Sequence, residues 1–147
     1  MKIYLDVCCL NRPFDDQTQE RVHLETEAIE FILLHFEKGD WRWVGSEALI
    51  YEVNHVTNID RRFNIFRLMS LIQESRSVSE KSIARAKQLV DLGFKALDAL
   101  HIACAEDAKA DVFLTTDDRL LKTAMRNAKV IDVCVANPLK WLEEQMP

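Results

Sequence analysis

Apolar residues occur along the chain in short runs that are separated by longer stretches with a helical period. Four of these runs are rich in aliphatic and aromatic residues and are bounded by polar or turn-forming residues, which favours β-strands. They predict strands at residues 2–6, 41–45 (WRWVG), 111–116 (DVFLTT) and 129–135 (KVIDVCV).

The stretches between these runs place apolar side chains three and four residues apart, as on one face of a helix. Gly39 and Gly93 end two of the predicted helices, whereas Ser46, Ser79 and Asn137 stand before others as N-caps. The predicted helices cover residues 18–39, 46–56, 61–73, 80–93, 96–110, 118–128 and 138–145.

The connections complete the predicted fold. NRPFDD (11–16) is expected to be a turn and RSV (76–78) a short link. Strands that alternate with helices predict a three-layer α/β/α fold with a central, mostly parallel sheet of four to five strands. Residues 1–147 are expected to form one domain, and a ligand site is expected outside the carboxyl ends of the strands.

Composition narrows the class of protein. Hydrophobic residues make up 48% and charged residues 29% of the chain, which is typical of a folded globular protein and excludes a disordered one. No apolar run approaches the roughly 20 residues of a membrane helix, and no leader peptide is visible, so we expect a cytoplasmic protein without membrane contact. The net charge of −5 argues against nucleic-acid binding through bulk positive charge.

The four cysteines do not form a disulfide framework. Cys8 and Cys9 are adjacent, whereas Cys104 and Cys134 lie far from them and from each other. All four stand in apolar surroundings, so we expect them to be small core residues.

Several acids stand where a ligand site is expected. Asp6 ends the first strand, Asp117 and Asp118 follow the strand 111–116, and Asp98 and Glu52 lie among apolar helical residues. Each has a structural alternative: Asp98, Asp117 or Asp118 at a helix start, and Glu52 on a solvated helix face. If they converge, each ionised pair about 5 Å apart costs roughly 3 kcal/mol at an effective dielectric of about 20. A cation would relieve this repulsion, and oxygen-only ligands suit Mg²⁺ or Mn²⁺.

Other chemistries have weaker support. With three glycines in the chain, a glycine-rich phosphate cradle is not expected. No serine or cysteine has a recognisable nucleophile motif. Of the four scattered histidines, His101 stands one helical turn after Asp98, and we expect a core or supporting role for it rather than metal ligation.

The motifs LDVCCLN, SEALIYEV and ALDALHIACAEDAKADVFLTTDDRLLK together resemble a PIN domain of the VapC-like toxin type. The resemblance spans nearly the whole chain, and its most specific part is DALHIA followed by an apolar strand and TTDD. It implies a metal-dependent endoribonuclease in which four acids act as catalytic residues and ligands of Mg²⁺ or Mn²⁺. By position these acids are Asp6, Glu52, Asp98 and Asp117, with Asp118 in reserve.

Four residues near these acids are expected to contact the substrate. By the resemblance, Thr115 and Thr116 match the hydroxyl-bearing residues that precede the fourth acid and are expected to hold a metal-bound water. Asn11 and Arg12 belong to the NRPFDD turn, which is not general to the family, and they come just after the strand that carries Asp6. Arg12 is therefore expected to bind a phosphate of the RNA, unless it pairs with Asp15 or Asp16 inside the turn. Further local basic groups for RNA are Arg61, Arg62, Lys95 and Arg119.

Proteins of this type usually form homodimers and are inhibited by a small antitoxin, which the resemblance implies here as well. The helix predicted at 61–73 is apolar enough for such contacts, although ordinary core packing would explain it equally. Its apolar residues are Phe63, Ile65, Phe66, Leu68, Met69 and Ile72.

Two other functions remain open at this point. A catalytically weak PIN-like module that binds RNA or protein receives slight support from Cys8, which replaces the Ser, Thr or Asn common at that place in the family. A receiver-like signalling domain would also gather acids at strand ends. It requires a lysine on a later strand, whereas Lys129 begins rather than ends the last predicted strand.

Overall fold

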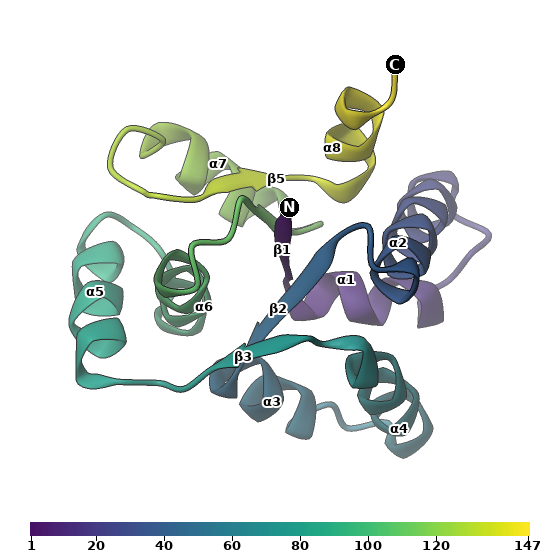
Figure 1. Ribbon diagram of the computed structural model, residues 1–147, viewed down its shortest axis with the longest axis horizontal. Helices are drawn as coiled ribbons and strands as arrows, with labels where there is room; N and C mark the ends of the chain where they lie inside the picture. Colours follow the sequence, from purple (N-terminus) through teal and green to yellow (C-terminus); the bar gives the residue numbers. More distant parts are fainter.

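The computed structural model describes residues 1–147, which form a five-stranded, fully parallel sheet between two layers of helices (Figure 1). The order of the strands is β3-β2-β1-β4-β5, so the N-terminal strand lies in the centre. The strands are β1 Lys2–Leu5, β2 Arg42–Ser46, β3 Glu74–Arg76, β4 Val112–Leu114 and β5 Cys134–Ala136. This architecture confirms the predicted fold class.

Eight helices and two 3₁₀ turns connect the strands. The helices are α1 Val7–Asn11, α2 Glu20–Lys38, α3 Glu47–Asn54, α4 Ile59–Leu68, α5 Glu80–Asp91, α6 Ala96–Asp107, α7 Asp118–Arg126 and α8 Pro138–Gln145. The 3₁₀ turns are η1 Arg12–Phe14 and η2 Met69–Leu71. None of the helices combines the length and the apolar character needed to cross a membrane.

The sheet separates two hydrophobic cores. Ile3 and Leu5 of β1 pack with α1, α2, α3, α4 and α8, whereas Tyr4 packs with α5, α6 and α7 on the opposite face. Figure 1 shows the second group of helices on the left and α2 and α8 on the right. Because side chains alternate across a strand and both faces of β1 are covered, its sequence is continuously apolar rather than alternating.

The register of the central strands positions the carboxyl ends that carry the candidate site. Leu5 of β1 pairs with Leu114 of β4, and Tyr4 pairs with Val44 of β2. The backbone N–H of Asp6 also donates to the carbonyl oxygen of Leu114, at 2.9 Å. The residues that follow β1 and β4 therefore begin side by side at one edge of the sheet.

Several segments differ from the sequence-based expectation. Residues 74–76 form the edge strand β3 although they carry no apolar pattern. They pair with β2 on one side through the backbone, and Glu74 also forms an ion pair with Arg42 of β2. The turn expected at 11–16 lies partly in α1 and η1, since the helix begins directly after Asp6. Of the strand expected at 129–135, only the last part belongs to β5, and Cys134 is exposed rather than a core residue.

The helix expected at 61–73 ends at Leu68 and continues as η2. Ile65 is fully buried, and Phe66, Leu68, Met69 and Ile72 pack partly buried against the same core. Only Phe63 projects to the surface, with 63% of its area exposed. Core packing therefore explains this segment, except for Phe63.

A reciprocal capping box begins α5, and its loss should be measurable. The Ser79 hydroxyl accepts a hydrogen bond from the backbone N–H of Ser82, and the backbone N–H of Ser79 donates to the Ser82 hydroxyl at 2.7 Å. We expect Ser79→Ala to lower the free energy of unfolding by about 1 kcal/mol, the usual effect of losing such a cap. Urea denaturation measures it, with exposed Ser70→Ala as the control. An equal effect of both changes would contradict the cap.

Candidate metal centre

Asp6 is the first residue after β1 and lies at the centre of the candidate site. Only 4% of its surface is exposed. One carboxylate oxygen accepts a hydrogen bond from the backbone N–H of Val7 at 2.8 Å, which caps α1. The other oxygen accepts from the Thr115 hydroxyl at 2.8 Å and from the Cys8 thiol at 3.3 Å. The strand thus ends at a carboxylate that is held in place by its neighbours.

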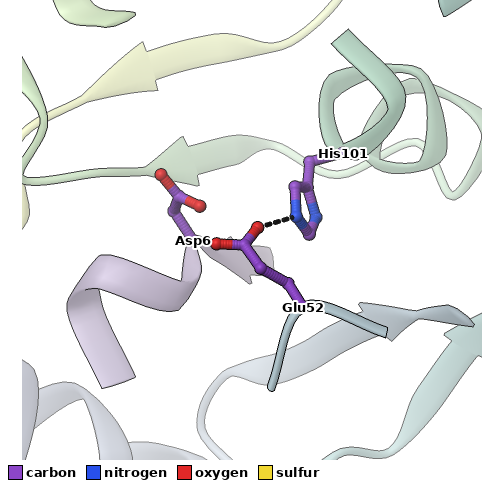
Figure 2. A group of neighbouring side chains, drawn as sticks. All are labelled: Asp6, Glu52 and His101. Carbon is purple, nitrogen blue, oxygen red and sulfur yellow. Dashed lines mark hydrogen bonds and ion pairs between the residues drawn. The ribbon is translucent and has the colours of Figure 1, made fainter. Parts of the chain in front are cut away.

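Glu52 and His101 bring two further ligand-type side chains to Asp6. His101, on α6, is completely buried, and its Nε2 lies 2.7 Å from Oε1 of Glu52, on α3. Figure 2 shows the Glu52 carboxylate between the histidine ring and Asp6. One ligand atom from each of the three residues lies within 4.8 Å of the others. This cluster joins β1, α3 and α6 at the carboxyl edge of the sheet.

Asp98 and Asp117 belong to the same electrostatic environment. Burial raises the pKa of Asp98, and the charges of Asp117 and Glu52 raise it further, against the opposing effects of His101 and Lys95. Burial also raises the pKa of Asp6 well above its ordinary value, and the charge of Asp98 adds to that shift. Burial and the neighbouring carboxylates therefore disfavour the ionised forms of Asp6 and Asp98 at this edge of the sheet.

Thr115 connects two of these acids. It is fully buried, its hydroxyl donates to Asp6, and its oxygen accepts from the backbone N–H of Asp117 at 3.1 Å. Thr116 is also buried, and its backbone N–H donates to the sulfur of Cys8 at 3.3 Å. The threonines thus contact the protein around the acids, and the Cys8 sulfur takes part in the same network.

Asp117 and Asp118 have different environments although they are adjacent. Asp117 caps α7 and accepts from the backbone N–H of Arg119 at 2.9 Å. Asp118 is exposed and forms a two-pronged ion pair with Arg21, both contacts being 2.8 Å, which lowers its pKa. Arg21 also donates to the carbonyl oxygen of Thr116 at 3.1 Å, so it contacts both residues that flank Asp117.

A groove adjoins the acids on the side of α1. It has a volume of about 630 Å³ and lies between α1, η1 and the loop that joins α3 to α4, with Cys8, Asn11, Arg12, Asp15 and Arg61 in its lining. Arg12 pairs with Asp15 in the turn and with Glu25 on α2. The pairing with Asp15 is the alternative that the sequence offered to phosphate binding.

The other basic residues considered for RNA contacts are spread around the site. Arg61 pairs with Asp15 at 3.0 Å and lies within 3.4 Å of the Asn11 side-chain oxygen. Arg62 donates to the carbonyl oxygen of Val56. Lys95 and Arg119 are exposed, at the starts of α6 and α7.

The residues present fit a hard divalent cation. The nearest charged donors are carboxylate oxygens, which Mg²⁺ and Mn²⁺ prefer, and the raised pKa values of Asp6 and Asp98 reflect an environment that a cation would relieve. Both ring nitrogens of His101 already have protein partners, Glu52 and Tyr4. Asp6 and Glu52 are therefore the nearest oxygen pair for an ion, with Asp98 and Asp117 beside them.

Sequence reasoning did not identify the supporting residues Tyr4, Arg21 and Glu25. The sequence did indicate a polar contact at Tyr4, because a tyrosine inside a fully buried strand needs a hydrogen-bond partner for its hydroxyl. A signal also existed for Glu25, since it stands three residues after Val22 and three before Ala28, in the apolar stripe of its helix.

Comparisons with known proteins agree with this architecture. The family model described as PIN domain matches residues 3–125, and the chain belongs to this family. The match confirms the family resemblance of the sequence motifs. None of the curated protein sequences matches the chain significantly.

Two solved structures share the fold. FitAcB from Neisseria gonorrhoeae is 20% identical, with a TM-score of 0.59 over 92% of this chain and 97% of that one. VapBC2 from Rickettsia felis, solved bound to a DNA fragment from their promoter, is 14% identical, with a TM-score of 0.57 over 93% of this chain and 98% of that one.

Proposed function

We propose that this protein is a metal-dependent endoribonuclease that hydrolyses phosphodiester bonds of RNA in the cytoplasm, with residues 1–147 acting as one domain. The observation that carries the proposal is the convergence of Asp6, Glu52 and His101 within 4.8 Å at the carboxyl edge of a parallel sheet. Membership of the PIN domain family supports the same reaction class. The carboxyl edge of the sheet, where these acids lie, is where parallel α/β folds bind ligands.

Each acid has a role in this proposal. Asp6 and Asp98 contact the principal ion, Mg²⁺ or Mn²⁺, while Glu52 and Asp117 complete its surroundings through oxygen atoms or water. The ion, when bound, offsets negative charge on the phosphoryl group and favours ionisation of water. Thr115 holds Asp6 and the backbone of Asp117 in a fixed relation through its hydroxyl. The protein thus orients the oxygen atoms before the ion binds.

The groove beside α1 is the proposed path of the RNA. Arg12, Asn11 and Arg61 line it next to Cys8, two residues after Asp6. Both side chains keep part of their surface exposed, 19% for Arg12 and 29% for Arg61, while acidic partners hold their guanidinium groups in place. Such oriented arginines suit phosphate contacts. The backbone around Thr116 would border the same substrate near the metal.

We further propose that the protein is the toxin of a toxin–antitoxin pair, with a small antitoxin as partner, and that it forms a homodimer. The likeness to FitAcB and VapBC2, which are named as two-component assemblies, supports a partner protein. Exposed apolar side chains on α3 and α4 are available for contacts with another chain: Tyr51, Ile59 and Phe63. Size-exclusion chromatography with light scattering tests the dimer.

Cleavage of RNA by the purified protein tests the proposed reaction. We expect internal cleavage of a mixed-sequence single-stranded RNA with Mg²⁺ or Mn²⁺, complete loss with EDTA, and recovery when excess ion is restored. Product ends and lengths on a denaturing gel distinguish internal cleavage from trimming. RNA binding without cleavage under every metal condition would instead support the non-catalytic binding module.

A further inference from the structure

A buried line of polar groups leads from the core to Glu52. The Tyr4 hydroxyl lies 2.6 Å from the Ser46 hydroxyl and 2.6 Å from Nδ1 of His101. Nε2 of the same ring lies 2.7 Å from Oε1 of Glu52. Tyr4 and His101 have no exposed surface and Ser46 has 1%, so water does not replace any of these partners.

The hydrogen atoms of this line can be counted from its ends. The Ser46 oxygen accepts from the backbone N–H of Leu49 at 3.1 Å and has a second lone pair, so the direction of its bond with Tyr4 depends on where the single Tyr4 hydrogen goes. At the other end, the Glu52 carboxylate is an acceptor only, so the hydrogen between Glu52 and His101 belongs to Nε2. A neutral ring then has a lone pair at Nδ1, which accepts the single hydrogen of the Tyr4 hydroxyl.

Only this direction satisfies every group with a neutral ring. If Nδ1 carried the only ring hydrogen, the lone pair of Nε2 would face the Glu52 carboxylate at 2.7 Å, and two acceptors would repel each other. Only a second proton on the ring would prevent this, and the ring would then be charged. Burial raises the pKa of Tyr4 well above its ordinary value, so its hydroxyl keeps its hydrogen. The donors therefore run from Ser46 to Tyr4, from Tyr4 to His101, and from His101 to Glu52.

We propose that Tyr4 and Ser46 are positioning residues, which hold His101 as the Nε2–H tautomer so that it orients Glu52. His101 accordingly supports the metal centre through Glu52 and is not itself a ligand. One Glu52 oxygen is fixed by the histidine, and the other lies toward Asp6 (Figure 2), where it would be available to a cation. The tautomer stands independently of the proposed nuclease function, and only its effect on ion binding rests on the metal centre that this function includes.

Nitrogen-15 NMR of the histidine side chains tests the tautomer in the full chain without metal. At mildly alkaline pH we expect His101 to show a protonated Nε2 and an unprotonated Nδ1, with its signals assigned by their absence in His101→Gln. A hydrogen on Nδ1, or on both nitrogens, in the wild-type protein would overturn the proposal. This readout decides the tautomer even if no variant of Tyr4 folds.

The matched pair Tyr4→Phe and Tyr51→Phe tests the positioning role. The chain has two tyrosines, and Tyr51 is 58% exposed, so its substitution controls for loss of a phenol hydroxyl. In Tyr4→Phe we expect the two ring-nitrogen signals of His101 to move toward each other as the tautomers mix. We also expect the Kd for Mn²⁺, measured by water-proton relaxation, to rise about tenfold, the lower end of the range for lost outer partners of ligands.

The outcomes separate the two proposals. Tautomer mixing with an unchanged Kd for Mn²⁺ would overturn the positioning role, as would an equal change in both tyrosine variants. The predicted tautomer together with Mn²⁺ binding but no RNA cleavage would sink the nuclease function and leave this inference standing.

Discussion

Asp6→Asn should lower the rate of RNA cleavage by about 1000-fold or more. Asp6 is buried, its oxygens are oriented by Val7 and Thr115, and it shares the site with Glu52. An ion stabilises the developing charge by several kcal/mol, and each 1.4 kcal/mol is about a factor of ten in rate. The measurement is single-turnover cleavage of a labelled RNA at saturating Mg²⁺ or Mn²⁺.

The same substitution should leave the metal-free protein at least as stable as the wild type. Burial raises the pKa of Asp6, so protonation of this carboxyl favours the folded state. That contribution is complete below the ordinary pKa, about 4, and is lost as the pH rises through the raised value. In EDTA, Asp6→Asn should therefore have the same free energy of unfolding as the wild type at acid pH. At neutral pH its free energy of unfolding, measured in urea, should be equal or higher.

The cleavage rate and the stability of Asp6→Asn need a control substitution at a different aspartate. Asp40 is exposed, pairs with His35 and precedes β2 at the opposite end of that strand, so Asp40→Asn should change neither cleavage nor the response to metal. Added Mg²⁺ should raise the melting temperature of the wild type and of this control, but not of Asp6→Asn. A large loss of stability of Asp6→Asn in EDTA would show that the carboxylate is structural.

Much of the fold could be predicted because hydrophobic periodicity reports burial directly. The apolar run from Ile3 to Leu5 indicated a buried strand, and the structure places it in the centre of the sheet. Asp6 and Asp117 were predicted at the carboxyl edge because they directly follow apolar strands, and the parallel register brings the ends of β1 and β4 together. Parallel strands align their ends whatever the side chains are.

The parts of the fold and of the site that the sequence did not predict depend on contacts between distant segments. Glu74–Arg76 forms β3 through backbone pairing with β2 at the edge of the sheet, so its side chains need no apolar pattern. The line from Ser46 through Tyr4 to His101 joins β2, β1 and α6, and no local spacing connects them. Sequence patterns therefore pointed to the acids, to Thr115 and to a supporting role for His101, but not to Tyr4 and Ser46, which contact that histidine only through the tertiary fold.

Glu25→Ala should cause the largest loss of stability of the substitutions considered, about 3 kcal/mol. Glu25 is 1% exposed on α2, and its carboxylate meets Arg12 at 2.8 Å, Arg21 at 3.3 Å and the Asn137 side chain at 2.6 Å. The substitution would leave these donors without their acceptor and open a cavity between α2, η1 and α8. Removing one partner of a buried ion pair typically costs about 3–5 kcal/mol.

The lower end of this range of about 3–5 kcal/mol applies because Arg12 would keep its ion pair with Asp15, and about half of the Arg21 side chain is already exposed to water. Urea denaturation measures the loss. Glu27→Ala on the same helix is the matched control, because Glu27 is 60% exposed and pairs only with His23, so its removal should cost less than about 1 kcal/mol.

Glu25→Gln separates the charge from the space that the side chain fills. The amide keeps the volume and one acceptor oxygen, so this variant should fall between the wild type and Glu25→Ala. Because Glu25 anchors Arg12 in the groove beside Asp6, we also expect Glu25→Gln to weaken RNA binding while Mn²⁺ affinity stays unchanged. Equal stability of Glu25→Ala and Glu27→Ala would mean that the arginines find other partners, and that the ion pairs do not hold η1 against α2.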